Sequence, residues 1–141
     1  MGLIVVGIDG SAGAKEALRF ALEESRLRGA RLRAVHAIGS FGSYPSLAVD
    51  VSAVHQAAQE LLANATSEAT AEDEVAIEGR VVEGAPGAVL VDESRDADLL
   101  VVGSRGHGGF VGLLLGSVSQ QCAHHAECPV VIVRASSEKR D

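Results

Sequence analysis

Five short, largely apolar runs, separated by segments with the periodicity of amphipathic helices, constrain the fold of this chain most. The runs lie at residues 3–8, 32–38, 75–82, 99–102 and 129–133. Apolar runs of this length are typical of strands buried on both faces of a sheet, whereas the alternating pattern of the third run is typical of a strand nearer the sheet edge. Strands that alternate with helices predict an open, mostly parallel sheet with right-handed crossovers and helices on both faces. We therefore predict an α/β fold.

Helix signals lie between these runs. Ser11 can cap a first helix, which Gly29 can end. Apolar residues repeat at intervals of three and four over residues 50–71, which predicts a long amphipathic second helix. Pro86 is well placed at the first position of a short third helix. The strands and helices therefore alternate along the chain.

The length and the composition fit one domain. A chain of 141 residues that is 47% hydrophobic but only 3% aromatic must build its core from Val, Leu, Ile and Ala. Sheets covered by Ala-rich helices have such cores. At this size roughly two thirds of the unfolded surface can be buried, which is enough for an ordinary core. We expect a single domain over residues 1–135 and a polar tail over residues 136–141.

The charge balance argues against nucleic acid as a partner. The formal net charge is -7, whereas nucleic-acid binding depends on clustered Lys and Arg. A cluster of arginines does occur near the end of the first helix, and we interpret it as a solvated surface; it comprises Arg26, Arg28, Arg31 and Arg33. The sequence has neither a signal-peptide pattern nor an apolar run of about 18 residues. We expect a soluble, cytoplasmic protein without membrane contact.

The segment 103–119, GSRGHGGFVGLLLGSVS, follows the fourth apolar run directly and is rich in glycine. A glycine-rich turn between a buried strand and a helix offers backbone N–H groups and a helix N-terminus to an anion. The helix should begin at Ser117, whose hydroxyl can cap it, with Gln120 completing an S-x-x-Q capping box. Arg105 makes the segment neutral to basic within an acidic chain. These features predict a phosphate-binding site.

Two common phosphate-binding motifs are absent from the sequence. No G-x-x-x-x-G-K-S/T occurs, so the lysine that clamps the β and γ phosphates is missing. The turn after the first strand, residues 7–11, lacks the G-x-G-x-x-G of dinucleotide-binding folds. In an open parallel sheet a ligand lies beyond the carboxyl ends of the strands, where the winding direction reverses. If the first and fourth strands are neighbours, Asp9, Ala37 and the glycine-rich segment line one crevice there.

The glycine spacing matches the pattern G-x2-G-x9-G-S/T, with Gly103, Gly106, Gly116 and Ser117 at its fixed positions. Four further segments stand in register with it: IVVGIDGS at 4–11, VHA at 35–37, GAP at 84–86 and CPVVIV at 128–133. On these segments the chain resembles the ATP-binding branch of the universal stress protein family along almost its whole length. The resemblance implies a five-stranded sheet of order 3-2-1-4-5, as in adenine nucleotide alpha hydrolase-like folds.

The resemblance also implies a site for ATP, with Mg²⁺ bridging the phosphates. Asp9, preceded by Gly7 and Ile8, would lie beside the ribose and phosphates, and the backbone of Ala37 would read the adenine edge. A first group of residues would wrap the ribose and the first phosphates: Val102, Gly103, Arg105 and Gly106. A second group would donate N–H and hydroxyl groups to the phosphate chain: Gly116, Ser117, Val118 and Ser119.

Several of these residues have a second interpretation. Asp9 can instead accept N–H bonds from the helix that follows it, and Arg105 can be solvated. His36 fits a core or pocket wall better than a ligand or base. A metal site is conceivable among neighbouring cysteines and histidines, although the cysteines fit small buried apolar residues better; these are Cys122, His124, His125 and Cys128.

The resemblance implies a stress-response regulatory protein that holds ATP and whose ligand state an unknown protein partner reads. The family's last strand often pairs with its copy in a second subunit, so Pro129 to Val133 are the expected edge of a homodimer. We expect at most slow ATP hydrolysis, because no nucleophile and base stand at a recognisable spacing. Two alternatives stay open: a nucleotide-using enzyme, either an ATPase or an adenylate transferase, and a stress interaction protein that binds a cyclic nucleotide or no nucleotide.

Overall fold

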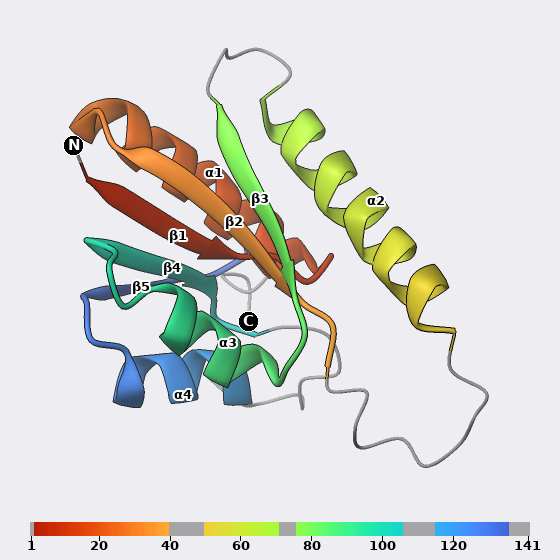
Figure 1. Ribbon diagram of the computed structural model, residues 1–141. Coiled ribbons are helices and arrows are strands. Elements are labelled where there is room, and N and C mark those ends of the chain that lie inside the picture. Colours follow the sequence, from red (N-terminus) through yellow and green to blue (C-terminus); the bar gives the residue numbers. More distant parts are fainter. Residues whose placement is uncertain (1, 40–49, 71–75, 106–114, 136–141) are drawn as a thin grey trace.

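A computed structural model describes residues 2–39, 50–70, 76–105 and 115–135 of the chain. Strands and helices alternate in the predicted order (Figure 1). The elements are β1 (Leu3–Gly7), α1 (Ala12–Arg28), β2 (Arg31–Ala37), α2 (Val51–Ala69), β3 (Ile77–Val82), α3 (Pro86–Glu93), β4 (Leu99–Gly103), α4 (Ser117–His125) and β5 (Val130–Val133). Each predicted strand is present, with ends that differ from the prediction by one or two residues. The predicted tail, 136–141, lies outside the described residues.

The five strands form one sheet in the order β3-β2-β1-β4-β5, and all neighbours are parallel. Helices α1 and α2 cover one face of this sheet, and α3 and α4 cover the other (Figure 1). The predicted fold class and strand order are therefore confirmed. The third strand lies at the sheet edge, as its alternating pattern predicted.

The central strand β1 contributes to a core on each face of the sheet. Ile4 and Val6 pack with residues of α1 and α2, whereas Leu3 and Val5 pack with residues of α3 and α4. All four side chains are at most 2% exposed. Because successive side chains of a strand point to opposite faces, an uninterrupted apolar run is what a strand covered by helices on both sides requires.

The ends of α1 follow their sequence signals. The Ser11 hydroxyl accepts a hydrogen bond from the N–H of Ala14 at 3.1 Å, and Gly29 ends the helix with a φ of 64°. Only glycine adopts such a left-handed conformation at little cost. None of the helices in the described part of the chain has the length and apolarity needed to span a bilayer.

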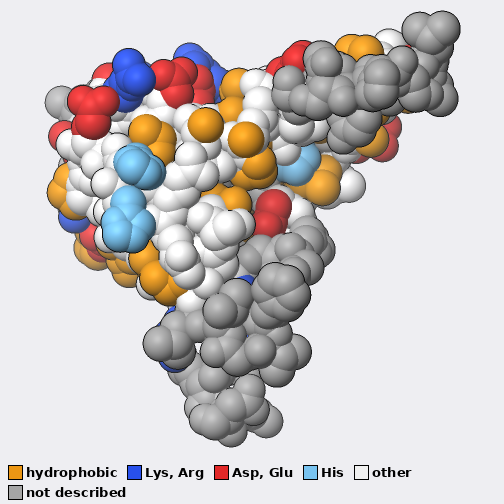
Figure 2. All heavy atoms as spheres, turned by 90° about the horizontal axis from the view of Figure 1, so that it is seen from below, with side chains coloured by type: hydrophobic (Ala, Val, Ile, Leu, Met, Phe, Trp, Pro, Cys, Tyr) orange, Lys and Arg blue, Asp and Glu red, His pale blue; other side chains and the backbone are white. Residues whose placement is uncertain are grey.

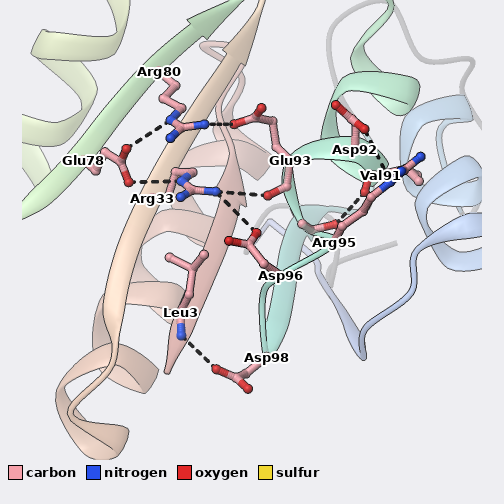
Figure 3. Close-up of polar contacts among 11 residues, drawn as sticks. Leu3, Arg33, Glu78, Arg80, Val91, Asp92, Glu93, Arg95, Asp96 and Asp98 are labelled. Carbon is pink, nitrogen blue, oxygen red and sulfur yellow. Dashed lines mark hydrogen bonds and ion pairs between the residues drawn. The ribbon is translucent and has the colours of Figure 1, made fainter. Parts of the chain in front are cut away.

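The solvated interpretation of the arginine cluster is wrong at Arg33, which is 7% exposed. Its guanidinium lies between β2, β3 and the end of α3 (Figure 3), where it contacts Glu78 at 3.0 Å, the carbonyl of Glu93 at 3.2 Å and Asp96 at 3.7 Å. Arg80 adds a further ion pair to Glu78 at 3.0 Å. Hydrogen bonding to Arg33, ahead of that to Arg80, holds the pKa of Glu78 below its ordinary value. Arg33 is buried because acidic and carbonyl partners surround it.

Candidate ligand-binding site at the carboxyl edge of the sheet

The direction of winding reverses between β1 and β4. From β1 the chain proceeds to β2 and β3 on one side, and it then crosses to place β4 and β5 on the other. Because all strands are parallel, their carboxyl ends meet at one edge, so Asp9, Ala37 and Gly103 lie beyond or at the ends of three adjacent strands. This is the position at which open α/β sheets bind ligands. The condition that we set for a shared site, that β1 and β4 are neighbours, is met.

Asp9 makes a tight turn between β1 and α1. Its Oδ1 accepts hydrogen bonds from the backbone N–H of Ser11 at 2.9 Å and from the Ser11 hydroxyl at 2.5 Å. Gly10, between them, has a φ of 83°, which glycine tolerates without steric cost. Asp9 therefore accepts from the N-cap residue of α1 and not from an N–H of the helix itself, which begins at Ala12. Its partly exposed carboxylate still borders the carboxyl edge.

The backbone of Ala37 extends past the last pair that β2 makes with β1. That pairing ends at Gly7 opposite Val35. The carbonyl of Val35 faces β1, since it accepts from the N–H of Ile8 at 2.8 Å, whereas the N–H of Ile38 faces β3 and donates to Val82 at 3.0 Å. Backbone groups alternate in direction along a strand, so the N–H and the C=O of Ala37 both face the β1 side.

Two glycines bring α1 and the end of β4 into backbone contact. A Cβ on Gly13 would lie 2.9 Å from the carbonyl oxygen of Arg105, and a Cβ on Gly103 would lie 2.8 Å from the carbonyl carbon of Gly13. Both distances are shorter than carbon side chains tolerate. The absence of side chains at these two positions thus lets the start of α1 pack directly on the strand end where the glycine-rich segment begins.

The carbonyl of Ser104 joins the two ends of the glycine-rich segment. It accepts hydrogen bonds from the N–H of Gly116 at 2.6 Å and from the Ser119 hydroxyl at 2.8 Å. Ser104 and Ser119 are almost fully buried, with 0% and 2% exposure, and the N–H of Ser104 donates to Val133 of β5. The start of α4 is therefore held at the end of β4.

The predicted capping box at the start of α4 is wrong. The helix does begin at Ser117, but its N-cap is Gly116, and no side chain caps it. The side chain of Gln120 donates to the carbonyl of Leu115 at 3.2 Å instead. The first N–H with an intrahelical acceptor is that of Gln120, which donates to Gly116. The N–H groups of Ser117 and Val118, like that of Ser119, precede it and have no acceptor within the helix.

The starts of α1 and α2 differ from that of α4 in this respect, whereas α3, which begins at Pro86, likewise has no side-chain cap. Ser11 caps α1 and Asp50 caps α2 through their side chains. The uncapped start of α4 leaves several N–H donors and the positive end of a helix dipole at the carboxyl edge of the sheet. Such an arrangement suits an anion.

Most of the residues predicted for the site lie at one edge of the sheet, but two residues that organise this edge were not predicted. Gly7, Ile8, Asp9, Ala37, Val102, Gly103, Arg105, Gly116, Ser117, Val118 and Ser119 lie at or beside the carboxyl edge. Gly106 lies outside the described residues. The residues not predicted are Gly13 and Ser104. His36, which fits a pocket wall by sequence, has its Nδ1 2.7 Å from the carbonyl oxygen of Ile8. In the sequence, the one available signal for the two residues that were not predicted was Gly13 itself, a glycine in the first turn of a helix with a predicted cap.

The metal interpretation of the cysteines and histidines finds no support in the described residues. Cys122 is fully buried, whereas His124 and His125 are exposed on α4, with ring centroids 6.3 Å apart. Figure 2 looks at the molecule from the side of α3 and α4, and shows two histidine side chains next to each other on that surface. Within the described ranges no three His, Cys, Asp or Glu side chains are grouped as metal ligands would be.

The fold and the site define a class of protein: a doubly wound α/β domain in which an uncapped helix begins near the place where the direction of winding reverses. The sequence model described as the universal stress protein family matches residues 1–134. The chain belongs to the universal stress protein family.

Similar proteins of known sequence support this assignment. The chain is 40% identical over 134 residues to a universal stress protein of Mycobacterium tuberculosis, covering 94% of this chain and 45% of that protein. It is 36% identical over 132 residues to one of Mycolicibacterium smegmatis, covering 93% of this chain and 45% of that protein. The chain thus spans about half the length of these curated relatives.

Several solved structures share the fold. A universal stress protein in complex with cAMP has a TM-score of 0.76 and 31% identity, and the match covers 96% of this chain and 98% of that one. The protein from Archaeoglobus fulgidus in complex with dAMP has a TM-score of 0.74 and 28% identity, with 94% and 98% coverage. A family protein from Arabidopsis thaliana with AMP bound has a TM-score of 0.70 and 25% identity, with 100% and 96% coverage.

Proposed function

We propose that this chain is a cytoplasmic, ATP-binding regulatory protein of the stress response, with residues 1–135 as its nucleotide-binding domain. The observation that carries the proposal is the uncapped start of α4, which the Ser104 carbonyl holds beside the end of β4. Oriented N–H groups at a helix N-terminus bind phosphate. The adenine nucleotides named for the related structures support the choice of ligand.

The base and the phosphates would occupy different parts of the carboxyl edge. The N–H and C=O of Ala37 face the β1 side together and offer a donor beside an acceptor, the complement of the adenine edge. The N–H groups of Ser117 and Val118 would bind the phosphate chain, with Arg105 and Gly106 nearer the ribose. The Ser119 hydroxyl is bonded to the Ser104 carbonyl, so we assign the phosphate contact of Ser119 to its N–H.

Mg²⁺ fits this site as an ion held mainly by phosphate oxygens and water. Asp9 supplies one carboxylate at the edge, with Oδ1 already accepting two hydrogen bonds from Ser11. Mg²⁺ is usually bound through one or two carboxylates together with substrate phosphates. When bound, the ion neutralises phosphate charge that α4 and Arg105 would otherwise have to offset.

The homodimer would form through β5. This strand pairs with β4 on one side and forms an edge of the sheet on the other, and its four residues Val130–Val133 are all partly exposed. An apolar edge strand is a surface for pairing with a second chain. A second copy would extend the sheet across a two-fold axis.

Calorimetric titration of the purified protein with Mg²⁺ and ATP, ADP, AMP or adenosine tests the proposal. Two variants separate the groups at the start of α4. Ser117→Ala removes a hydroxyl, whereas Ser117→Pro also removes the N–H, and proline fits the first position of a helix after an extended residue such as Gly116. We expect ATP affinity to fall about tenfold or more in Ser117→Pro, less in Ser117→Ala, and adenosine affinity to change in neither.

Native protein that binds no adenine nucleotide at millimolar concentration would refute the proposal. Acid extraction of natively purified protein, followed by mass spectrometry, identifies any nucleotide that the protein retains. A second candidate ligand is a cyclic nucleotide, because one of the related structures is a complex with cAMP. The same titration with cAMP as a further ligand decides between them: a site built around the start of α4 should prefer ATP, whose phosphate chain is longer and more highly charged.

A further inference from the structure

The side chain of His36 bonds to the carbonyl oxygen of Ile8, which would otherwise accept the N–H of Ala37 in the pairing of β1 with β2. In a parallel ladder whose last bond runs from the N–H of Ile8 to the carbonyl of Val35, the next bond runs from the N–H of Ala37 to the carbonyl of Ile8. That bond is not formed, since the pairing of β1 with β2 ends at Gly7 and Val35. The carbonyl of Ile8 is instead bonded to Nδ1 of His36 at 2.7 Å.

The chemistry of this contact fixes where the imidazole carries its proton. A carbonyl oxygen only accepts, so Nδ1 of His36 is the donor and bears the hydrogen. At 2.7 Å this is a short hydrogen bond. Within residues 2–39, 50–70, 76–105 and 115–135, the N–H of Ala37 has no acceptor on the β1 side. A side chain thus ends the ladder one bond early.

We propose that His36 is a positioning residue for base selection: by bonding the Ile8 carbonyl, it keeps the N–H and C=O of Ala37 available to an adenine ring. The proposal rests on the proposed nucleotide-binding function. Without the histidine donor, the Ile8 carbonyl accepts the N–H of Ala37, and β1 and β2 pair for one more bond. The donor that reads the base is then consumed by the protein itself.

The selectivity follows from the order of donor and acceptor. Adenine presents an amino donor next to the ring acceptor N1, which matches a backbone C=O beside an N–H. Hypoxanthine presents a carbonyl next to an N1–H, so both contacts would be mismatched. A paired contact of this kind discriminates between bases by roughly 10- to 100-fold. The native protein should therefore bind AMP more tightly than IMP by a factor in this range.

Three substitutions test the role of the histidine. His36→Phe keeps the ring but removes the donor, and His36→Val does the same with a residue suited to strands. His36→Asn retains an amide N–H close to the position of Nδ1. We expect AMP affinity to fall about tenfold in the Phe and Val variants, and the ratio of AMP to IMP affinity to approach one. The Asn variant should keep most of the native ratio. Thermal melting confirms that each variant is folded.

Amide hydrogen exchange of the ligand-free protein supplies a second readout. Ala37 should exchange more slowly in His36→Phe than in the native protein, because its N–H gains the Ile8 carbonyl. If the native protein binds AMP but the ratio of AMP to IMP affinity is unchanged in both donor-less variants, the role of His36 is refuted while the proposed function stands. If the native protein binds neither AMP nor ATP, the proposed function fails, and base selection by His36 fails with it.

Discussion

The contact between Gly13 and the end of β4 gives a sharp test of how the site is assembled. Gly13 is the second residue of α1 and is buried. The methyl group of alanine there would lie 2.9 Å from the carbonyl oxygen of Arg105 and 3.7 Å from the Cα of Gly103. The nearest atom belongs to backbone and cannot rotate away. Either α1 or the strand end must shift by several tenths of an ångström, which we expect to lower stability.

The matched control is Gly87, which is likewise buried at the second position of a helix, α3. A Cβ on Gly87 would meet mainly the end of the Gln121 side chain, which is exposed and can rotate away; the Cβ of Gln121, at 3.1 Å, requires a smaller displacement than the backbone contact at Gly13 does. Both substitutions gain the same helix propensity, up to about 1 kcal/mol. Overpacking against backbone costs about 1–3 kcal/mol. We therefore expect Gly13→Ala to be less stable than Gly87→Ala by about 1–3 kcal/mol.

Thermal and urea unfolding of the two variants, followed by circular dichroism, measure this difference. For a chain of this size 1 kcal/mol corresponds to a Tm change of roughly 3–4 °C, so Gly13→Ala should melt roughly 3–12 °C below Gly87→Ala. ATP affinity, measured well below both Tm values, should fall only in Gly13→Ala, since only that change displaces the backbone of Arg105. Equal Tm values, or a Gly13→Ala variant that is the more stable of the two, would refute the reasoning.

Three further predictions concern residues away from the glycine contact. Ser119→Ala removes a buried hydroxyl that donates to the Ser104 carbonyl at 2.8 Å. We expect a loss of about 1 kcal/mol in urea unfolding and weaker ATP binding, and an unchanged unfolding curve would contradict this. The pKa of Glu78 is lowered in the folded protein, so the stabilising contribution of its carboxylate is complete above the ordinary pKa of 4.5 and is lost as the pH falls through the lowered pKa. Below pH 4.5 the native protein should therefore lose up to about 1 kcal/mol more stability than the Glu78→Gln variant does. Parallel profiles of stability against pH for the two proteins would contradict this prediction. Burial raises the pKa of Cys122 to about 11, so iodoacetamide at pH 8 should leave Cys122 unmodified in the folded protein. In guanidinium the same reagent should alkylate both Cys122 and Cys128, and peptide mass spectrometry locates the label. Rapid labelling of Cys122 in the native protein would exclude its buried position.

Sequence reasoning recovered the features that depend on local pattern. The apolar runs located the strands, because a strand covered on both faces needs apolar residues at successive positions. Ser11 and Gly29 located the ends of α1, since a hydroxyl acceptor and a left-handed φ are local requirements of helix ends. The strand order and the assignment of Ala37 required the family resemblance, because neither is encoded in periodicity.

Features that join distant residues were missed. The expected cap at Ser117 fits the local pattern, but the N-cap is Gly116, one residue earlier, where the Ser104 carbonyl, fifteen positions before Ser119, holds the start of α4. Arg33 belongs by sequence to an exposed cluster, yet Glu78, 45 positions away, makes its burial possible. No window of local sequence contains both members of either pair, so these contacts became visible only in three dimensions.

The placement of β1 at the centre of the sheet has a consequence for folding during synthesis. β1 pairs with β4, and the N–H of Leu3 bonds the carboxylate of Asp98 across 95 positions. At a synthesis rate of roughly 5–20 residues per second, about 5–20 s pass between the synthesis of β1 and the synthesis of β4. During this interval one edge of an apolar strand has no partner and is exposed to other nascent chains. Slow translation between β3 and β4 should therefore increase aggregation more than the same delay after β5.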